Sequence, residues 1–178
     1  MKYDRAMIEV KQCADTNVYV LKNILSQEQC DYFIKEFSSI TELQIIMQMP
    51  KVSEALWGFI GSKISPIEFI DEKRSSKFHV VSLKSDITIS KARFSLGRHV
   101  DKKLGDDHFK LFFYLNKMSA NGGTDFYGEP ESLNKTSISN EAGYGVLFDI
   151  SLEHGSQPFP SGEIKYVIGV RPNVNYVE

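Results

Sequence analysis

The sequence has little cysteine and no long apolar run, and both shortages exclude whole classes of protein. Its 178 residues include only two cysteines, Cys13 and Cys30, which are too few for a disulfide framework or a cysteine-based zinc site. No stretch is apolar enough over the length that crosses a membrane. The opening segment MKYDRAMIEVKQ also lacks the apolar run of a signal peptide. We therefore expect an intracellular, cytoplasmic protein with no membrane partner.

A strong excess of charge of either sign is missing as well. The 21 lysines and arginines nearly balance the 23 aspartates and glutamates, so that the formal net charge is −2 and the pI is ≈ 6.1. A protein that grips nucleic acid through a basic face carries a clear positive excess, so we do not expect a nucleic-acid partner. Hydrophobic residues make up 42% of the chain and charged residues 25%, which is ordinary for a globular chain of this length. We predict a single domain over residues 1–178.

The first half of the chain carries two helix signals. In VYVLKNILSQEQCDYFIKEFSSI, a short strand-like run is followed by Ser26, with Gln29 three residues later, which is the spacing of a capping box. A second helix is expected from about Lys51, directly after Pro50. We predict a helical support over about residues 24–65. Its core-facing apolar residues recur at helical spacing, namely Cys30, Phe33, Ile34 and Phe37 in the first helix and Val52, Ala55, Leu56, Phe59 and Ile60 in the second.

From residue 77 the apolar pattern changes to that of strands. The runs are FHVVSL, DITISKARFSL, FKLFFYLN, GTDFYGE, GVLFDIS and KYVIGV, which are β-branched and aromatic and are separated by turn-forming residues. So many short strands predict a sandwich or an open barrel. We therefore predict an α+β fold with a β-core over about residues 77–178 and the helices packed on one of its sheets.

The segment GRHVDKKLGDDHFKLFFYLN contains a dense group of metal-ligand residue types. Alternation in a strand points residues i and i+2 to the same side, so His99 and Asp101 can present an imidazole and a carboxylate to one point. An H-x-D pair alone is a weak signal, and a strand-end histidine is more often a surface or core residue than a ligand. The third candidate is His154, at the end of the apolar run in FDISLEHGSQP. Two histidines and one carboxylate on one face of a metal leave the other face open, which suits iron(II) that binds a co-substrate and dioxygen.

Lys165 is a candidate for holding an acidic co-substrate. A chelating 2-oxoacid such as 2-oxoglutarate carries a second carboxylate, which needs a buried cation. Lys165 lies eleven residues past His154 and opens the apolar run KYVIGV, where a lysine is a poor choice unless its charge has a partner. The alternative is an edge lysine that extends its ammonium to solvent.

These segments together resemble a known family. Taken in order, HVD, LFFYLN, NGGTDFY, GYGVLFD and HGSQPFPSGEIKYVIGV are similar to segments of the iron(II)- and 2-oxoglutarate-dependent oxygenases, specifically of the prolyl 4-hydroxylase-like branch. The segment VYVLKNILSQEQCDYFIKEF also resembles the strand and helix with which that branch begins. The resemblance covers nearly the whole chain. It implies a double-stranded β-helix of jelly-roll or cupin type, in which two facing sheets hold the iron at one open end.

The resemblance also implies roles for individual residues. His99, Asp101 and His154 match the iron ligands, and Lys165 matches the basic residue that holds the distal carboxylate of 2-oxoglutarate. Tyr114 matches a tyrosine that hydrogen-bonds the same carboxylate in some members, with an inward-packing aromatic as the alternative. The implied cofactors are iron(II), 2-oxoglutarate and dioxygen, with ascorbate as a supporting reductant. The implied reaction is hydroxylation of a C–H bond, by analogy in a prolyl residue of a protein or peptide, with succinate and CO2 as co-products.

Other interpretations remain open. Many members of this branch carry a tyrosine where KARFSLGRHVD has Phe94, so one hydrogen bond to the co-substrate is missing or comes from elsewhere, with Arg98 as a candidate. HGSQP and RPNVNYV also resemble AlkB-type nucleic-acid demethylases, in which an arginine past the distal histidine binds the co-substrate, and Arg171 is that candidate here. A non-catalytic β-sandwich binding module is the third possibility. His108 is expected not to be a metal ligand.

Overall fold

The computed structural model describes residues 8–40, 44–128 and 133–178, which form two β-sheets and two α-helices. No helix in these ranges is long and apolar enough to cross a membrane. In chain order the elements are β1 (Ile8–Cys13), β2 (Thr16–Leu21), α1 (Gln27–Glu36), β3 (Gln44–Gln48), α2 (Pro50–Ile64), β4 (Phe69–Asp71), the 3₁₀ turn η2 (Glu72–Arg74), β5 (Ser76–Ala92), β6 (Phe109–Tyr114), β7 (Thr124–Tyr127), β8 (Lys135–Ile138), β9 (Gly145–Asp149), β10 (Glu153–Ser156) and β11 (Lys165–Val177).

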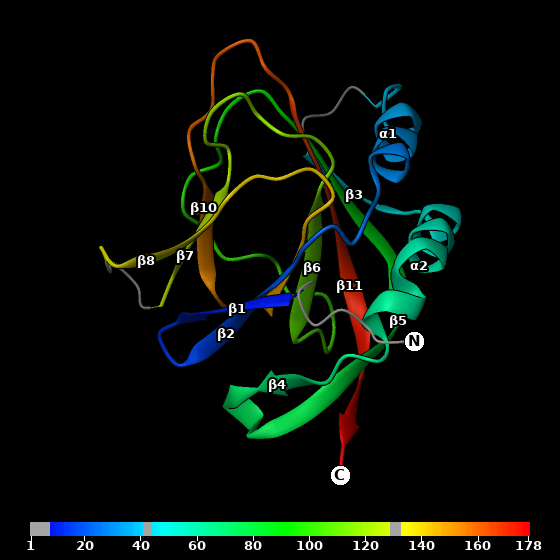
Figure 1. Ribbon diagram of the computed structural model, residues 1–178, viewed down its shortest axis with the longest axis vertical. Coiled ribbons are helices and arrows are strands. Elements are labelled where there is room, and N and C mark those ends of the chain that lie inside the picture. The colour runs from blue at the N-terminus through cyan, green and yellow to red at the C-terminus, as the bar shows by residue number, and fades with distance from the viewer. Residues whose placement is uncertain (1–7, 41–43, 129–132) are drawn as a thin grey trace.

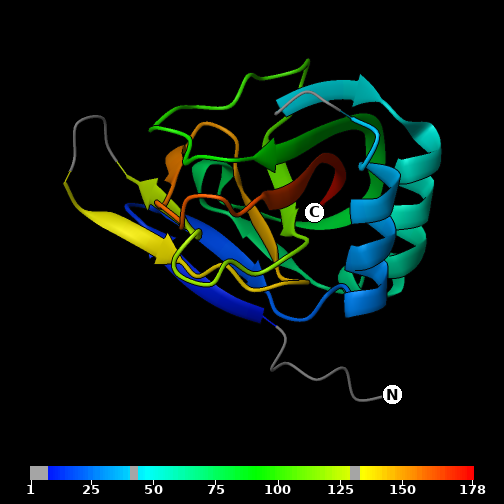
Figure 2. The same ribbon diagram turned by 90° about the horizontal axis from the view of Figure 1, so that it is seen from above.

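The strands form one large and one small sheet. The large sheet has the order β1-β2-β9-β6-β11-β5-β3, with β4 paired to β5, and the small sheet has the order β10-β7-β8. Each strand pair is antiparallel. The small sheet lies on one side of the large sheet, and α1 and α2 lie on the other side (Figures 1 and 2). This mostly antiparallel arrangement confirms the expected β-sandwich of jelly-roll type.

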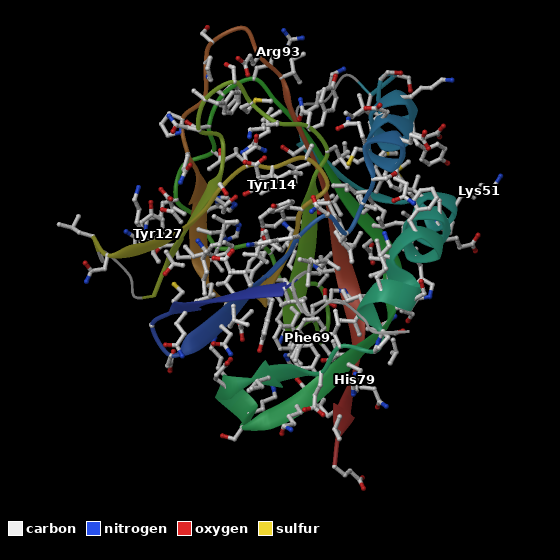
Figure 3. The ribbon with its side chains drawn as sticks, in the orientation of Figure 1. Lys51, Phe69, His79, Arg93, Tyr114 and Tyr127 are labelled. Atoms are coloured by element: carbon white, nitrogen blue, oxygen red, sulfur yellow. The ribbon has the colours of Figure 1, made fainter. Side chains whose placement is uncertain are left out.

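Side-chain alternation gives the large sheet two different faces. On β6, Leu111 and Phe113 belong to the apolar cluster shared with the helices. Their neighbours Phe112 and Tyr114 point the other way, into a second cluster that includes Phe126 of the small sheet. Tyr114 accordingly lies in the middle of the molecule, beside β6 (Figure 3). The space between the two sheets is therefore where polar groups of the β-core can meet.

The two helices begin where the sequence predicts. Ser26 caps α1, and Ser26 and Gln29 form both hydrogen bonds of the capping box. Helix α2 begins at Pro50, whose missing N–H costs nothing in the first turn. Buried side chains of both helices, Phe33 and Leu56 among them, share one cluster with the sheet residue Ile89. The helices thus cover the face of the large sheet that is turned away from the small sheet.

Some strands differ from their predicted extents. FHVVSL and the first seven residues of DITISKARFSL, up to Ala92, are parts of one continuous strand, β5, and residues 93–96 lie beyond its end. The polar residues between them do not form a turn, because the backbone stays paired with β11 at Leu83 and with β3 at Asp86. Their side chains also have partners, since Lys84 bonds to Asp107 and Ser85 Oγ donates to Gln48 Oε1. The segment Glu153–Ser156 is itself a strand, β10, although it has no β-branched residue. Strand propensity alone therefore could not find the element that carries His154.

We predict that Ser26→Ala lowers the free energy of unfolding by about 1 kcal/mol, the usual cost of a lost helix cap. Ser26 Oγ accepts the backbone N–H of Gln29 at 3.2 Å, and Gln29 Oε1 accepts the N–H of Ser26 at 2.9 Å. Urea denaturation measures the change. Ser26→Asp keeps an acceptor at the cap and should retain most of the stability, so an equal loss in both variants would contradict a capping role.

Candidate metal centre and cofactor pocket

The two predicted histidine ligands face each other across a short antiparallel bridge. His99 and His154 pair as an isolated bridge in which each backbone N–H donates to the carbonyl of the other at 2.8 Å. The ring centroids are 4.5 Å apart. A Cβ at Gly155 would lie 3.2 Å from the backbone nitrogen of Arg98, so glycine at this position allows the two segments to approach. The bridge joins the segment after β5 to β10 of the small sheet.

Each imidazole is oriented by its own main chain. Nδ1 of His99 lies 2.7 Å from the carbonyl oxygen of Gly97, and Nδ1 of His154 lies 3.0 Å from that of Leu152. Because a carbonyl oxygen only accepts, each Nδ1 carries a proton, and in the neutral form of either ring the free lone pair is on Nε2. Burial lowers the pKa of His154 to about 4, against the attraction of Asp101. His154 is therefore neutral at pH 7, as a metal ligand has to be.

Asp101 completes a set of three donors. Its Oδ1 is 3.8 Å from His99 Nε2 and its Oδ2 is 3.5 Å from His154 Nε2. One ligand atom from each of these residues lies within 4.8 Å of the others. Atoms held at about 2.1 Å from one ion lie roughly 3.0 to 3.4 Å apart, so small side-chain movements would close the set on a divalent cation. The structure thus brings together the three residues that the sequence singles out.

Lys110 on β6 is a member of this cluster that the sequence reasoning missed. Its Nζ donates to Asp101 Oδ2 at 2.7 Å, and the two side chains are 9% and 10% exposed. Burial lowers the pKa of Lys110, although Asp101 opposes this effect. Burial alone would raise the pKa of Asp101, but the attraction of Lys110 and the imidazoles outweighs it, so that pKa lies below its ordinary value. The missed signal was strand alternation, which places Lys110 on the same face as Phe112 and Tyr114.

A cavity extends from these residues into the space between the sheets, and Lys165 lies in its wall. Lys165 is 4% exposed, and its Nζ donates to the carbonyl of Gly122 at 3.0 Å. Within the described ranges no carboxylate forms an ion pair with Lys165. Burial lowers its pKa to about 8. The cavity is lined by Thr88, Ser90, Ala92, Leu96, His99, Asp101, Lys110, Phe112, Tyr114, Thr124, His154, Ser156, Lys165, Val167 and Gly169.

Tyr114 lies in the same cavity wall, close to Lys165. Its hydroxyl is 2.6 Å from Thr124 Oγ1, and either group can donate. The Lys165 ammonium is 6.0 Å from the centre of the Tyr114 ring. Burial raises the pKa of Tyr114, so its hydroxyl stays protonated at neutral pH. Lys165, Tyr114 and Thr124 therefore offer one charged and two hydroxyl groups to an anion.

Arg171 occupies a different place from the other candidates. It is 2% exposed, but it is absent from the described residues that line the cavity. Its Nε lies 3.3 Å from Asp107 Oδ2, and its Nη2 donates to the carbonyl of Lys102 at 3.1 Å. Arg171 thus anchors the loop that runs from Asp101 to β6.

Three other residues that the sequence analysis raises, Phe94, Arg98 and His108, also lie outside the cavity lining. Phe94, where the sequence resemblance would place a tyrosine, is 59% exposed. His108 bonds through Nδ1 to Arg74 Nη2 at 2.8 Å and is not part of the group of candidate ligands. Arg98 forms an ion pair with Glu153 at 2.7 Å, and its guanidinium lies 3.9 Å from the centre of the Tyr127 ring. Figure 3 places Tyr127 beside β7, in the small sheet.

Comparison with solved structures identifies the fold. No family model matches the sequence, and no curated protein matches it significantly. The viral collagen prolyl hydroxylase of Paramecium Bursaria Chlorella virus-1 superposes with a TM-score of 0.52 at 18% identity, over 87% of this chain and 89% of that one. A Trichoplax adhaerens prolyl hydroxylase, solved with a hypoxia inducible factor peptide fragment, superposes with a TM-score of 0.56 at 13% identity, over 87% and 82%. The chain has a prolyl 4-hydroxylase-like oxygenase fold. This agrees with the resemblance that the sequence motifs show.

We predict that raising the pH from 8 to 10.5 stabilises the ligand-free protein relative to its Lys165→Met variant. The pKa of Lys165 is about 8 in the folded protein, below its ordinary 10.5, so the unfolded chain binds more protons across this window. Below pH 8 the ammonium is charged in both states and its burial cost is fully present. A shift of this size corresponds to roughly 3 kcal/mol.

Urea denaturation of both proteins at pH 7 and pH 10 measures this difference. The variant should be the more stable protein at pH 7, and the gap should narrow at pH 10. Taking the difference removes the contribution of the tyrosines, which titrate in both proteins. A gap that does not change with pH would show that Lys165 is not buried as a cation.

Proposed function

We propose that this protein is an iron(II)- and 2-oxoglutarate-dependent dioxygenase that hydroxylates a C–H bond, with a prolyl residue of a protein or peptide as substrate. One observation carries the proposal. His99, Asp101 and His154 converge at one end of a cavity in whose wall Lys165 is buried, and no carboxylate of the described residues forms an ion pair with this lysine. Two neutral nitrogens and one carboxylate on one face are typical donors for non-haem iron(II), and a buried cation is what the far carboxylate of a 2-oxoacid requires.

Six polar residues of the cavity wall have a part in this proposal. His99 and His154 would hold iron(II) through Nε2, and Asp101 would supply the anionic donor. Lys165 would form an ion pair with the distal carboxylate of 2-oxoglutarate, whose charge would remove the cost of burying the ammonium. The hydroxyls of Tyr114 and Thr124 bond to each other at 2.6 Å in the same cavity wall, so one donates to the other and the remaining hydroxyl proton can be donated to the carboxylate.

When bound with dioxygen, iron(II) and 2-oxoglutarate supply the oxidising chemistry, in which 2-oxoglutarate becomes succinate and CO2 and one oxygen atom enters a substrate C–H bond. The protein orients these groups and excludes water from them. Ala92, Phe112 and Val167 give the cavity its apolar wall. Ascorbate would keep the iron reduced.

The substrate proposal rests on the outer surface beside the metal residues. A groove of about 600 Å³ opens next to His99 and Asp101, and its wall includes Ile46 and Val100. A groove of this kind can take an extended segment of a protein or peptide. The preference for proline follows from the two similar structures, both prolyl hydroxylases, of which one was solved with a peptide fragment.

The position of Arg171 favours a hydroxylase over an AlkB-type demethylase. In the demethylase interpretation Arg171 would bind 2-oxoglutarate, but its Nε faces Asp107 and its Nη2 donates to Lys102. Lys165 lines the cavity, and none of the acidic residues that the structure describes forms an ion pair with it. Of the two lysines in the cavity wall, Lys110 is paired with Asp101, so the basic residue available to the co-substrate is Lys165.

We predict that His99→Ala and His154→Ala each abolish iron binding, with Asp101→Ala nearly as severe because it removes the anionic donor. Anaerobic titration with iron(II) and 2-oxoglutarate measures this through the weak visible charge-transfer band of the chelate. His108→Ala is the matched control, because His108 bonds to Arg74 away from the cluster, and it should keep its iron affinity within about threefold. Loss of iron in the His108 variant with retention in the His154 variant would refute this set of ligands. A wild-type protein that shows no band and forms no succinate in air would be a non-catalytic binding module.

We predict that Lys165→Met weakens 2-oxoglutarate binding by roughly 2–3 kcal/mol, the scale of a charged hydrogen-bonded partner. Calorimetric titration in the presence of Mn²⁺ measures this without turnover. Arg171→Gln keeps an N–H group near Lys102 and should leave the affinity unchanged. The reverse pattern would move the carboxylate anchor to Arg171 and favour the demethylase interpretation.

The substrate class has its own test. Candidate proline-containing peptides are incubated with the protein, iron(II), 2-oxoglutarate and ascorbate, and mass spectrometry locates any added oxygen. A gain of one oxygen atom on proline is the expected result. Oxidation of another residue with proline untouched would keep the dioxygenase and change its substrate.

A further inference from the structure

The carboxylate of Asp101 lies between the two histidines of the candidate metal centre and the ammonium group of Lys110. Its Oδ2 accepts a hydrogen bond from Lys110 Nζ at 2.7 Å, while its Oδ1 and Oδ2 also lie 3.8 Å and 3.5 Å from the two Nε2 atoms. Both Asp101 and Lys110 line the cavity. A divalent cation that enters the cluster would therefore meet an ammonium group already bonded to the same carboxylate.

The strands leave room for the lysine at this place. Lys110 stands on β6 and faces the cavity, and Gly169 stands on the adjacent strand β11. A Cβ at Gly169 would lie 3.0 Å from Lys110 Cε and 3.4 Å from Thr88 Cβ. The side chain of Lys110 thus packs against Gly169. A larger residue at position 169 would push this side chain away, so the glycine on β11 helps to fix where the ammonium group lies.

We propose that Lys110 is a positioning residue that holds Asp101 in the ligand-free protein and, by competing with the metal for this carboxylate, makes metal binding depend on a bound dicarboxylate. The inference rests on the proposed metal centre and deepens it. Lys110 acts through Asp101 and needs no contact with the substrate.

The charges of the cavity give the physical reason. Without ligands, Lys110 and Asp101 form a neutral pair, and Lys165 adds one positive charge. A divalent cation brings two more positive charges beside Lys110, and repulsion in a partly buried site is several-fold stronger than in water. The two negative charges of 2-oxoglutarate offset the two positive charges that the metal brings. Each ligand therefore raises the affinity of the protein for the other ligand by the same factor.

The same pair has a second effect on the protein without ligands. If Lys110 is removed, the Asp101 carboxylate stays 10% exposed with no cation bonded to it, which destabilises the fold. Among the described residues no other lysine or arginine forms an ion pair with Asp101, so bound metal would then supply its close counter-charge. Removal of Lys110 should therefore lower the stability of the ligand-free protein and raise its affinity for metal alone.

Manganese binding tests the proposal without any dependence on turnover. The Kd of Mn²⁺ is measured by electron paramagnetic resonance for the wild type, Lys110→Met and Lys110→Arg, each with and without saturating 2-oxoglutarate. Lys110→Met should bind Mn²⁺ alone roughly tenfold more tightly than the wild type, the scale of one charged hydrogen bond. The gain in Mn²⁺ affinity caused by 2-oxoglutarate should shrink by a similar factor. Lys110→Arg, which keeps a cation able to bond a carboxylate, should restore the dependence on 2-oxoglutarate.

Lys84→Met is the matched control. Lys84 pairs with the buried carboxylate of Asp107, but neither residue lines the cavity. This variant also loses a lysine–aspartate pair, yet its Mn²⁺ affinity should stay within about twofold of the wild type. A merely structural role of Lys110 would give the two variants the same behaviour.

The outcomes separate the two proposals. Lys110→Met with unchanged or weaker Mn²⁺ binding, or with the full effect of 2-oxoglutarate, overturns the role of Lys110. A wild-type protein that does not bind Mn²⁺, or binds it as well after His99→Ala, overturns the metal centre itself. If Lys110→Met does not fold, Lys110→Gln, which keeps a hydrogen bond to Asp101 and lacks the charge, must show the same loss of dependence on 2-oxoglutarate.

Discussion

Two backbone hydrogen bonds between His99 and His154 are the interaction on which the rest of the site depends. They join the segment that leaves β5 in the large sheet to β10 in the small sheet, so they hold the two sheets together at the end where the cavity contains its polar groups. This bridge determines the positions of both imidazole rings, because it holds the backbones of the two histidines opposite each other. Asp101 follows His99 by two residues, so its carboxylate lies next to the same two imidazole rings.

The balance of charge in the cavity follows from which strand faces are turned inward. β6 and β11 contribute Lys110 and Lys165, whereas the segment after β5 contributes one carboxylate, Asp101. The space between the sheets thus has an excess of positive charge before any metal enters. A dicarboxylate suits such a space better than a neutral molecule does. The outer groove differs, because it is open and has apolar residues such as Ile46 in its wall.

Much of this arrangement could be predicted from local sequence patterns. The capping box at Ser26 marks a helix start because its two hydrogen bonds form within one turn, and Lys165 was noticed because a charge stood in an apolar strand. Lys110 gives the same kind of signal inside FKLFFY, but its partner lies nine residues away across a loop, and no local rule pairs them. The contacts of Arg171 could not be predicted from the sequence either. The register of β11 shifts between Val170 and Pro172, so counting along the strand does not tell where the guanidinium ends.

The contacts of the two imidazole Nδ1 atoms have a consequence for how such a protein can evolve. Each histidine donates to the carbonyl two residues before it, Gly97 for His99 and Leu152 for His154. For each histidine, a main-chain carbonyl within the same three-residue segment therefore determines that Nδ1 carries a proton and that Nε2 faces the cavity residues. Residues around the mouth of the cavity can therefore diverge while the two Nε2 atoms keep their orientation. A sequence can in this way drift far from its structural relatives and still preserve the geometry of its centre.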